Sequence, residues 1–274
     1  MISVLILTLD EEVNIADCIC SIPWRDDVHV LDSGSHDETV AIARQLGATV
    51  HTRAFDTYSR QRNFGLGLPF TYPWVLMLDA DERLSPELAR EIADRLEKQN
   101  SSISAYRVRR KDMFMGRWLK RSSGYPSWFP RLFRKGCVTV KRDINEEYDI
   151  DGETGSFEGH LIHYPFNKGV SWWVDRHNRY SSMEAETLAA EMHDRHIAWG
   201  DLFSADPLVR RANLKQILYR LPGRPVLLFM YLYLFRLGFL DGRAGLTYAS
   251  LRFCYEMMIS AKLQEARQVG RSKS

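Results

Sequence analysis

The chain has 274 residues, of which 45% are hydrophobic and 26% charged, and this near-average composition excludes collagen, a coiled coil and a wholly disordered chain. The formal net charge of +2 hides two cationic segments, because residues 208–274 carry 12 basic and 3 acidic side chains and residues 107–142 carry 12 basic side chains and one acid. Such segments in a near-neutral protein indicate contact with an anionic surface or substrate.

The first hundred residues alternate short apolar runs with amphipathic stretches, which predicts strands separated by helices. Continuous Val, Ile and Leu runs between helices are typical of a parallel sheet covered on both faces, so we predict an α/β fold. The helix that begins at Ser85 has a proline in its first turn and an early acid, Glu87. The predicted strands are 2–7, 28–31, 48–51 and 74–78, and the predicted helices are 11–21, 37–46, 59–66 and the helix from 85.

The pattern changes after residue 103, where short strand-like runs are separated by glycine and aromatic residues, and again after Asn167, where the chain becomes helical. We therefore predict a first domain at residues 1–165 and a helical C-terminal extension at residues 166–274. The later predicted strands are 104–109, 131–134, 137–140 and 161–164, and the later predicted helices are 171–196, 208–220, 222–240 and one that ends near 262, before a frayed tail.

Residues 222–262 contain two apolar helices rich in Tyr, Phe, Leu and Met and flanked by arginine. The apolar run 226–240 has 15 residues, and a transmembrane helix needs roughly 20. The combination of apolar runs with a cationic surrounding favours a hairpin that lies in the membrane interface. The alternative is that both helices pack on the globular domain.

The start of the chain and its cysteines indicate the compartment. The first residues form a strand-like run without a basic flank or cleavage site, so we expect no secretory signal. Four scattered cysteines are too few for a disulfide framework, which favours a reducing, cytoplasmic setting.

Polar side chains follow the predicted strands. Thr8, Asp10 and Glu11 come after the first strand, and Asp79 and Asp81 come after the fourth. Ligands of parallel α/β sheets bind beyond the carboxyl ends of the strands. Two carboxylates two positions apart can converge on one hard cation and its phosphate oxygens, whereas the first group has the alternative role of capping a helix.

Four segments, in their order and spacing, resemble family 2 glycosyltransferases of the GT-A fold: residues 3–12, 30–39, 60–65 and 78–82. Three later segments resemble the bacterial branch that includes lipopolysaccharide-core glucosyltransferases: residues 131–134, 178–181 and 238–242. The resemblance implies a GT-A, Rossmann-like, mostly parallel sheet with helices on both faces and a helical, membrane-associated extension. It also implies an inverting enzyme that moves a hexose, glucose by analogy, from a UDP-sugar donor to a lipopolysaccharide core or other cell-envelope glycan.

The resemblance assigns roles to individual positions. Asp79 and Asp81 match the Asp-x-Asp pair that contacts the ribose and the Mg²⁺ or Mn²⁺ on the diphosphate. Both are therefore metal candidates, Asp79 is also a nucleotide-sugar candidate, and Asp81 is also a catalytic candidate. Glu146 matches the position of the general base, although Asn145 stands where a histidine is usual. The remaining nucleotide-sugar candidates are Thr8, Asp10 and Glu11 in the nucleotide pocket, Asp32 at the base, and Arg62 and Asn63 at the rim of the donor site.

Two other functions fit parts of the pattern. A nucleotidyltransferase has a similar sheet, but we expect a Gly-rich, basic loop after its first strand, where this chain has Thr8–Glu12. A non-catalytic membrane-surface adaptor would keep the fold and lose metal-dependent nucleotide binding. We expect no nucleic acid partner, because no nucleic-acid module is present.

The remaining histidines, including His160 and His163, lack a compact metal-ligand spacing, and we expect them to be structural. The predicted location is the cytoplasmic face of the inner membrane, with the protein peripherally attached to that anionic surface. The sequence does not indicate an oligomeric state.

Overall fold

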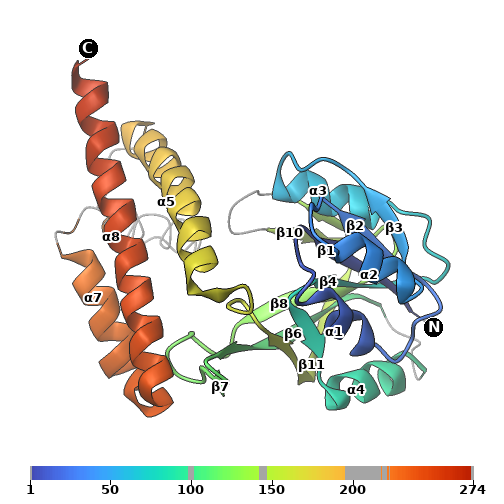
Figure 1. Cartoon of the computed structure of the whole chain (residues 1–274). Coiled ribbons are helices and arrows are strands. Elements are labelled where there is room, and N and C mark those ends of the chain that lie inside the picture. Colours follow the sequence, from blue (N-terminus) through green and yellow to red (C-terminus); the bar gives the residue numbers. More distant parts are fainter. Residues whose placement is uncertain are drawn as a thin grey trace. The chain divides into compact units, whose positions relative to one another are not determined.

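The computed structural model describes residues 2–97, 102–141, 147–194, 217, 221 and 223–272 (Figure 1). The chain divides into two compact units. The first unit consists of Met1–Met113 with Tyr125–Asn167, and the second of Phe114–Gly124 with Lys168–Ser274. The predicted folding domains 1–165 and 166–274 stay a prediction, because compact units do not test independent folding.

The first unit is built on a mixed sheet in the order β3-β2-β1-β4-β8-β6-β11-β5. The strands β3, β2, β1 and β4 are parallel, and β11 is parallel to β6. Strand β8 runs antiparallel to both β4 and β6, and β5 runs antiparallel to β11. The bounds are β1 Ser3–Thr8, β2 Val28–Asp32, β3 Thr49–Thr52, β4 Trp74–Asp79, β5 Glu82–Leu84, β6 Ile103–Phe114, β8 Trp128–Arg134 and β11 Glu153–His163, with a separate antiparallel pair, β9 Val138–Val140 and β10 Tyr148–Ile150.

Alternating side chains of the strands fill two hydrophobic layers, one on each face of the sheet. Val4 and Val30 belong to the layer that contains residues of α1, α2 and α4, whereas Leu5 and Leu31 face the other layer. Helix α3 approaches this second face closely, since a Cβ on Gly65 would lie 2.8 Å from Leu5 Cδ2. The helices are α1 Ile15–Cys20, α2 Thr39–Gln45, α3 Tyr58–Leu66 and α4 Pro86–Glu97. The predicted α/β sheet with helices on both faces is therefore present.

The second unit is helical and begins with α5, Gly169–Asp194. Helix α8, Gly242–Ser272, packs against α5 through a small apolar cluster (Figure 1). Between them the chain forms α7 Arg224–Met230, a π-helical turn η2 Tyr231–Phe235 and a 3₁₀ turn η3 Gly238–Asp241. Helix α8 continues beyond the predicted end near 262, so the predicted frayed tail is wrong as far as Ser272. The predicted helix 208–220 lies outside the described residues, apart from Ile217.

Segment 114–124, which contains β7 (Arg117–Trp118), belongs to the second unit, and the carboxylate of Asp241 binds it there. Asp241 Oδ2 accepts hydrogen bonds from the backbone N–H groups of Arg121, at 2.9 Å, and Ser122, at 2.8 Å. It also accepts one from Ser122 Oγ at 2.8 Å. The side chain of Asp241 thus joins two segments about 120 residues apart in the sequence.

No single described helix is long and apolar enough to cross a membrane. By length and composition alone, one bent pair, Arg224–Phe235 with Gly238–Ala266, passes the same test together, and its two parts meet at 70°.

Candidate active site

The site lies at the carboxyl end of β4. The preceding residues of this strand are buried between the two apolar layers, and Asp79 is its last residue. Two backbone hydrogen bonds fix the turn that follows, from Ala80 N to Leu7 O at 3.1 Å and from Tyr164 N to Asp81 O at 2.9 Å. The carboxylates of Asp79 and Asp81 therefore sit where β1, β4 and the end of β11 meet.

Two buried arginines hold the carboxylate of Asp79. Arg62 Nη2 donates to Asp79 Oδ1 at 3.0 Å, and Arg131 Nη2 donates to Asp79 Oδ2 at 2.9 Å. Burial favours the neutral acid, but the positive charges of Arg62 and Arg131 outweigh it and lower the pKa of Asp79. Asp79 is thus an ionised hydrogen-bond acceptor at neutral pH.

Glu82 fixes both the backbone and the side chain of Asp79. Its carboxylate is fully buried and accepts two bonds from Arg131, to Oε2 from Nε at 2.9 Å and to Oε1 from Nη2 at 2.8 Å. Glu82 Oε2 also accepts the backbone N–H of Asp79 at 3.1 Å. A bidentate pair of this kind has little orientational freedom, so the position of Asp79 is set before any ligand binds.

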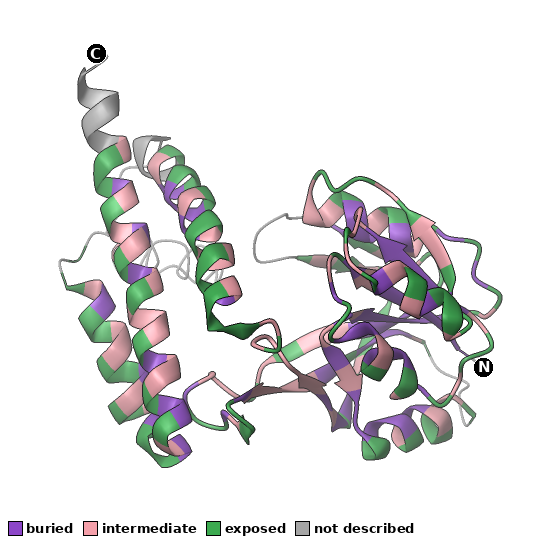
Figure 2. Ribbon diagram, in the orientation of Figure 1, coloured by how far each residue is buried: buried purple, intermediate pink, exposed green. Residues whose placement is uncertain are grey.

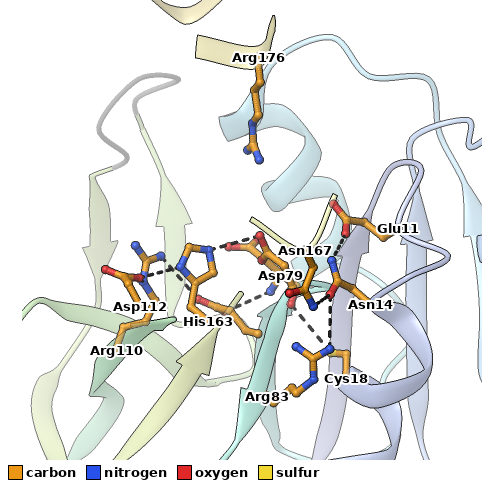
Figure 3. Close-up of polar contacts among 12 residues, drawn as sticks. Glu11, Asn14, Cys18, Asp79, Arg83, Arg110, Asp112, His163, Asn167 and Arg176 are labelled. Carbon is orange, nitrogen blue, oxygen red and sulfur yellow. Dashed lines mark hydrogen bonds and ion pairs between the residues drawn. The ribbon is translucent and has the colours of Figure 1, made fainter. Parts of the chain in front are cut away.

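Asp81 has a different neighbour, His163, at the end of β11. His163 Nε2 lies 3.2 Å from Asp81 Oδ2, and its Nδ1 lies 2.7 Å from Asp112 Oδ1 (Figure 3). The parallel register of β6 and β11 pairs Asp112 with His163 and so brings these side chains together. Burial and Arg110 lower the pKa of His163, but the carboxylates of Asp81 and Asp112 outweigh them and raise it to about 9.

A cation bound to Asp81 would need oxygen ligands from a bound phosphate. Within the described residues, no group of three or more His, Cys, Asp or Glu side chains is arranged to hold a metal ion. Mg²⁺ at phosphate sites is usually bound by one or two carboxylates together with the substrate's phosphates, rather than by a cage of protein ligands. Thr8 is the last residue of β1, the strand next to β4. Its Oγ1 is buried and has no hydrogen-bond partner among the described residues, which leaves it available to a ligand.

The loops after β1 and β2 are joined through Asp10. Its backbone N–H donates to Ser35 Oγ at 2.8 Å, and its Oδ1 accepts the backbone N–H of His36 at 2.8 Å. Asp10 has a φ of 52°, which lies in the left-handed region. Hydrogen bonds of Asp10 therefore hold the two predicted nucleotide-binding loops together.

The other acids of these loops also have partners. Asp32 Oδ2 accepts the backbone N–H groups of Gly34 and Ser35, each at 2.9 Å, so Asp32 shapes its own loop. Glu11 Oε2 accepts a bond from Asn14 Nδ2 at 2.8 Å (Figure 3). The predicted base-reading role of Asp32 stays a prediction.

One predicted residue, Asn63, is not brought to the carboxylates. Asn63 Nδ2 donates to the backbone carbonyl of Val140, and Asn63 Oδ1 accepts the backbone N–H of Val140, each at 2.8 Å. Adjacent residues of a helix point in different directions, and on α3 it is Arg62 that points toward Asp79. Glu146, the predicted general base, lies outside the described residues together with Asn145.

The partners of the predicted acids do not follow from the sequence. It predicts a structural role for His163 and no site role for Glu82, Arg131 or Asp112. The rule that polar residues at strand ends bind ligands, applied to the predicted strand 161–164, would have singled out His163. The pairing of Arg131 with Glu82 has no local signal, because it depends on the antiparallel insertion of β8 beside β4.

Comparison with known proteins gives one family. A family model described as Glycosyl transferase family 2 matches residues 3–153, which is more than half of the chain. An uncharacterized glycosyltransferase of Rickettsia typhi is 31% identical over 202 residues, covering 69% of this chain and 68% of that protein. The lipopolysaccharide core biosynthesis glycosyltransferase LpsC of Rhizobium meliloti is 28% identical over 194 residues, covering 68% and 70%.

Among solved structures, glucosyl-3-phosphoglycerate synthase from Mycobacterium tuberculosis, in complex with Mn²⁺, UDP and glucosyl-3-phosphoglycerate, is 24% identical with a TM-score of 0.34. The match covers 46% of this chain and 47% of that one. A likeness this distant says nothing about the ligands of this chain.

Proposed function

This chain belongs to glycosyl transferase family 2, and on that premise we propose that it is an inverting, metal-dependent enzyme that moves a hexose from a UDP-sugar to a lipopolysaccharide core or other cell-envelope glycan. The predicted family is confirmed, and the nucleotidyltransferase alternative is set aside by the family match. The observation that carries the proposal is the pair of differently held carboxylates, Asp79 and Asp81, at the end of β4.

The two carboxylates have different roles in the proposed reaction. Asp81 holds Mg²⁺ or Mn²⁺, which stabilises the negative charge that develops on the leaving UDP. Asp79 stays ionised between Arg62 and Arg131 and is positioned to accept a hydrogen bond from the ribose. Its rigid frame means that the donor binds to a group that needs no reorganisation.

The remaining roles rest on the family. An inverting transfer needs a base that removes the proton of the acceptor hydroxyl, and a positioned carboxylate contributes typically about 10²–10⁴-fold. Glu146 is our candidate for that base. The relative LpsC, named for lipopolysaccharide core biosynthesis, supports an acceptor of that class, and glucose is the proposed sugar.

Calorimetric titration of the whole chain with UDP, in the presence and absence of Mn²⁺, tests the donor site. We expect binding that depends on the metal and that Asp81→Asn removes, whereas Asp94→Asn, an exposed acid on α4, leaves it unchanged. Release of UDP from UDP-glucose, UDP-galactose or UDP-N-acetylhexosamines then identifies the sugar. If UDP binds equally well without metal, or not at all, the proposed function is wrong.

A further inference from the structure

We propose that segment 114–124 and the helices from α7 to the start of α8 form one composite surface that binds an anionic lipid bilayer. We call this the lipid-binding surface and define it as residues 114–124 and 226–246. The inference deepens the proposed function by naming where a membrane-bound acceptor's bilayer is contacted. It stands on the second unit alone, so it does not depend on the chemistry of Asp79 and Asp81.

The first component of the surface is an exposed apolar face. The exposed apolar residues of α7 and η2 lie at positions 226, 227, 230, 231, 234 and 235. This spacing of three to four residues between pairs places them along one side of a helix. Phe235 is 78% exposed, and Figure 2 shows exposed residues along α7. The large exposed apolar side chains of this stretch are Val226, Leu227, Met230, Tyr231, Leu234, Phe235, Leu237, Phe239, Leu240 and Leu246.

This concentration differs from ordinary surface hydrophobicity. Single exposed apolar residues are normal on soluble proteins, but a contiguous patch of this kind marks an interaction site. The opposite side of the same helices is used for packing, since Pro225, Leu232 and Ala249 are buried. The exposed apolar face is therefore not used in the internal packing of the second unit.

The second component is a cationic rim. Arg117, Lys120, Arg121 and Arg243 are exposed. Asp241, two residues before Arg243 in the chain, is 6% exposed and accepts hydrogen bonds from the backbone N–H groups of segment 114–124. Its negative charge is thus turned inward, while the positive charges face solvent.

The Asp241 hydrogen bonds make these two components one surface. They attach segment 114–124 to η3, and a Cβ on Gly242 would lie 2.9 Å from Arg117 Nη1, so Arg117 lies directly beside the start of α8. Met115, which is 64% exposed, adds an apolar side chain at the turn before Arg117. Basic residues from the middle of the sequence are thereby brought to the rim of an apolar face near its end.

An anionic bilayer matches both components, because the apolar face enters the boundary between headgroups and acyl chains while the rim contacts the phosphates. A second copy of the chain fits less well. In a two-fold symmetric dimer the same patch meets itself, which places the two cationic rims close together.

Co-sedimentation of the full chain with vesicles tests the proposal, using phosphatidylcholine alone and phosphatidylcholine mixed with phosphatidylglycerol in equal parts. Phe235→Ser with Leu240→Ser is expected to lower the apparent affinity for mixed vesicles at least about tenfold, because interfacial binding scales with buried apolar area. Both side chains are exposed, so the fold does not depend on them. The matched control is Phe55→Ser with Val170→Ser, which are 44% and 43% exposed outside this surface.

A second variant removes the rim. Arg117→Gln, Lys120→Gln and Arg121→Gln together are expected to reduce binding to mixed vesicles by about fivefold for each residue, with little change on phosphatidylcholine alone. The matched control is Arg25→Gln, Arg44→Gln and Arg90→Gln, which makes the same change in charge at exposed positions of the first unit.

The outcomes separate the possibilities. Equal losses in the Arg117, Lys120 and Arg121 variant and its control would show attraction by net charge only, and equal losses in the two serine variants would show that the apolar face is not the contact; either result would overturn the proposal. Loss of a dimer in light scattering, without any vesicle binding by the unmodified chain, would identify a second copy as the occupant and also overturn it. Metal-dependent UDP binding should be unchanged in all these variants, so failure here is distinguishable from failure of the proposed function.

Discussion

The two units distribute charge and apolar surface in opposite ways. In the first unit apolar side chains fill both faces of the sheet, and the buried charges converge on Asp79 at the end of β4. In the second unit the buried charges connect helices, as Arg224 and Glu256 do between α7 and α8, while large apolar side chains remain exposed.

Buried ionisable groups therefore have different roles in the two units. In the first unit the paired charges of Arg62 and Arg131 hold the carboxylate of Asp79 in place at the end of β4, so burial prepares a ligand site. In the second unit the described partners of Asp241 and Glu256 are architectural.

The largest expected effect is on folding of the first unit. Arg131→Met leaves the fully buried carboxylate of Glu82 without its bidentate partner, which is expected to cost about 3–5 kcal/mol in the free energy of unfolding. Urea denaturation followed by circular dichroism measures it. The double variant Arg131→Met with Glu82→Leu removes both charges and should recover much of the loss. No recovery would mean that the pair does not act as a unit.

Asp81→Asn should affect activity rather than stability. Loss of the carboxylate that we assign to the metal is expected to reduce the transfer rate by about 10²–10³-fold, the range for removal of one group that stabilises developing charge. UDP release measures the rate, and the melting temperature should stay close to that of the parent. Retained turnover would remove Asp81 from the site.

A smaller effect is expected in the second unit. Asp241→Asn exchanges a carboxylate that accepts three hydrogen bonds for an amide, at a cost of about 1–3 kcal/mol. It also raises the net charge by one, yet binding to anionic vesicles should fall, because the rim is no longer held beside η3. Asp175→Asn, exposed on α5, makes the same change in charge as a control. Stronger vesicle binding by Asp241→Asn would contradict a composite surface.

Another effect in the second unit depends on pH. His177 stacks on Trp173 in α5, and burial is the main cause that lowers its pKa from 6.5 to about 4. The unfolded chain therefore takes up a proton at a higher pH than the folded chain, so this contribution to stability is complete above pH 6.5 and is lost as the pH falls toward 4. Urea midpoints across this window measure it. His177→Phe should show a flatter dependence, and an identical slope would assign the effect to other groups.

The sequence predicted the parallel half of the fold well, because the central strands β1 and β4 are mainly apolar runs and short helices with clear ends separate the strands from β1 to β4. It predicted the region around β6, β8 and β11 less well. There the register depends on strands far apart in the chain, and no local pattern tells that β8 inserts antiparallel between β4 and β6.

The same division applies to the site. Asp79, Asp81 and Arg62 could be found because they lie in short motifs at strand ends and on α3. His163 and Glu82 could not be assigned from their spacing, since they reach the site through the pairing of β11 with β6 and β5. Asn63 shows the converse, because motif membership placed it at the donor site while its amide is engaged by β9.

The Asp241 hydrogen bonds also constrain the order in which the chain can fold. Segment 114–124 leaves the ribosome more than a hundred residues before the carboxylate that binds it, whereas the strands on either side of it, β6 and β8, pair with each other in the first unit. Since domains fold largely as they are synthesised, the first unit can complete its sheet while this loop still lacks its partner. The second unit closes only when η3 has been made, so its assembly is a late, long-range event.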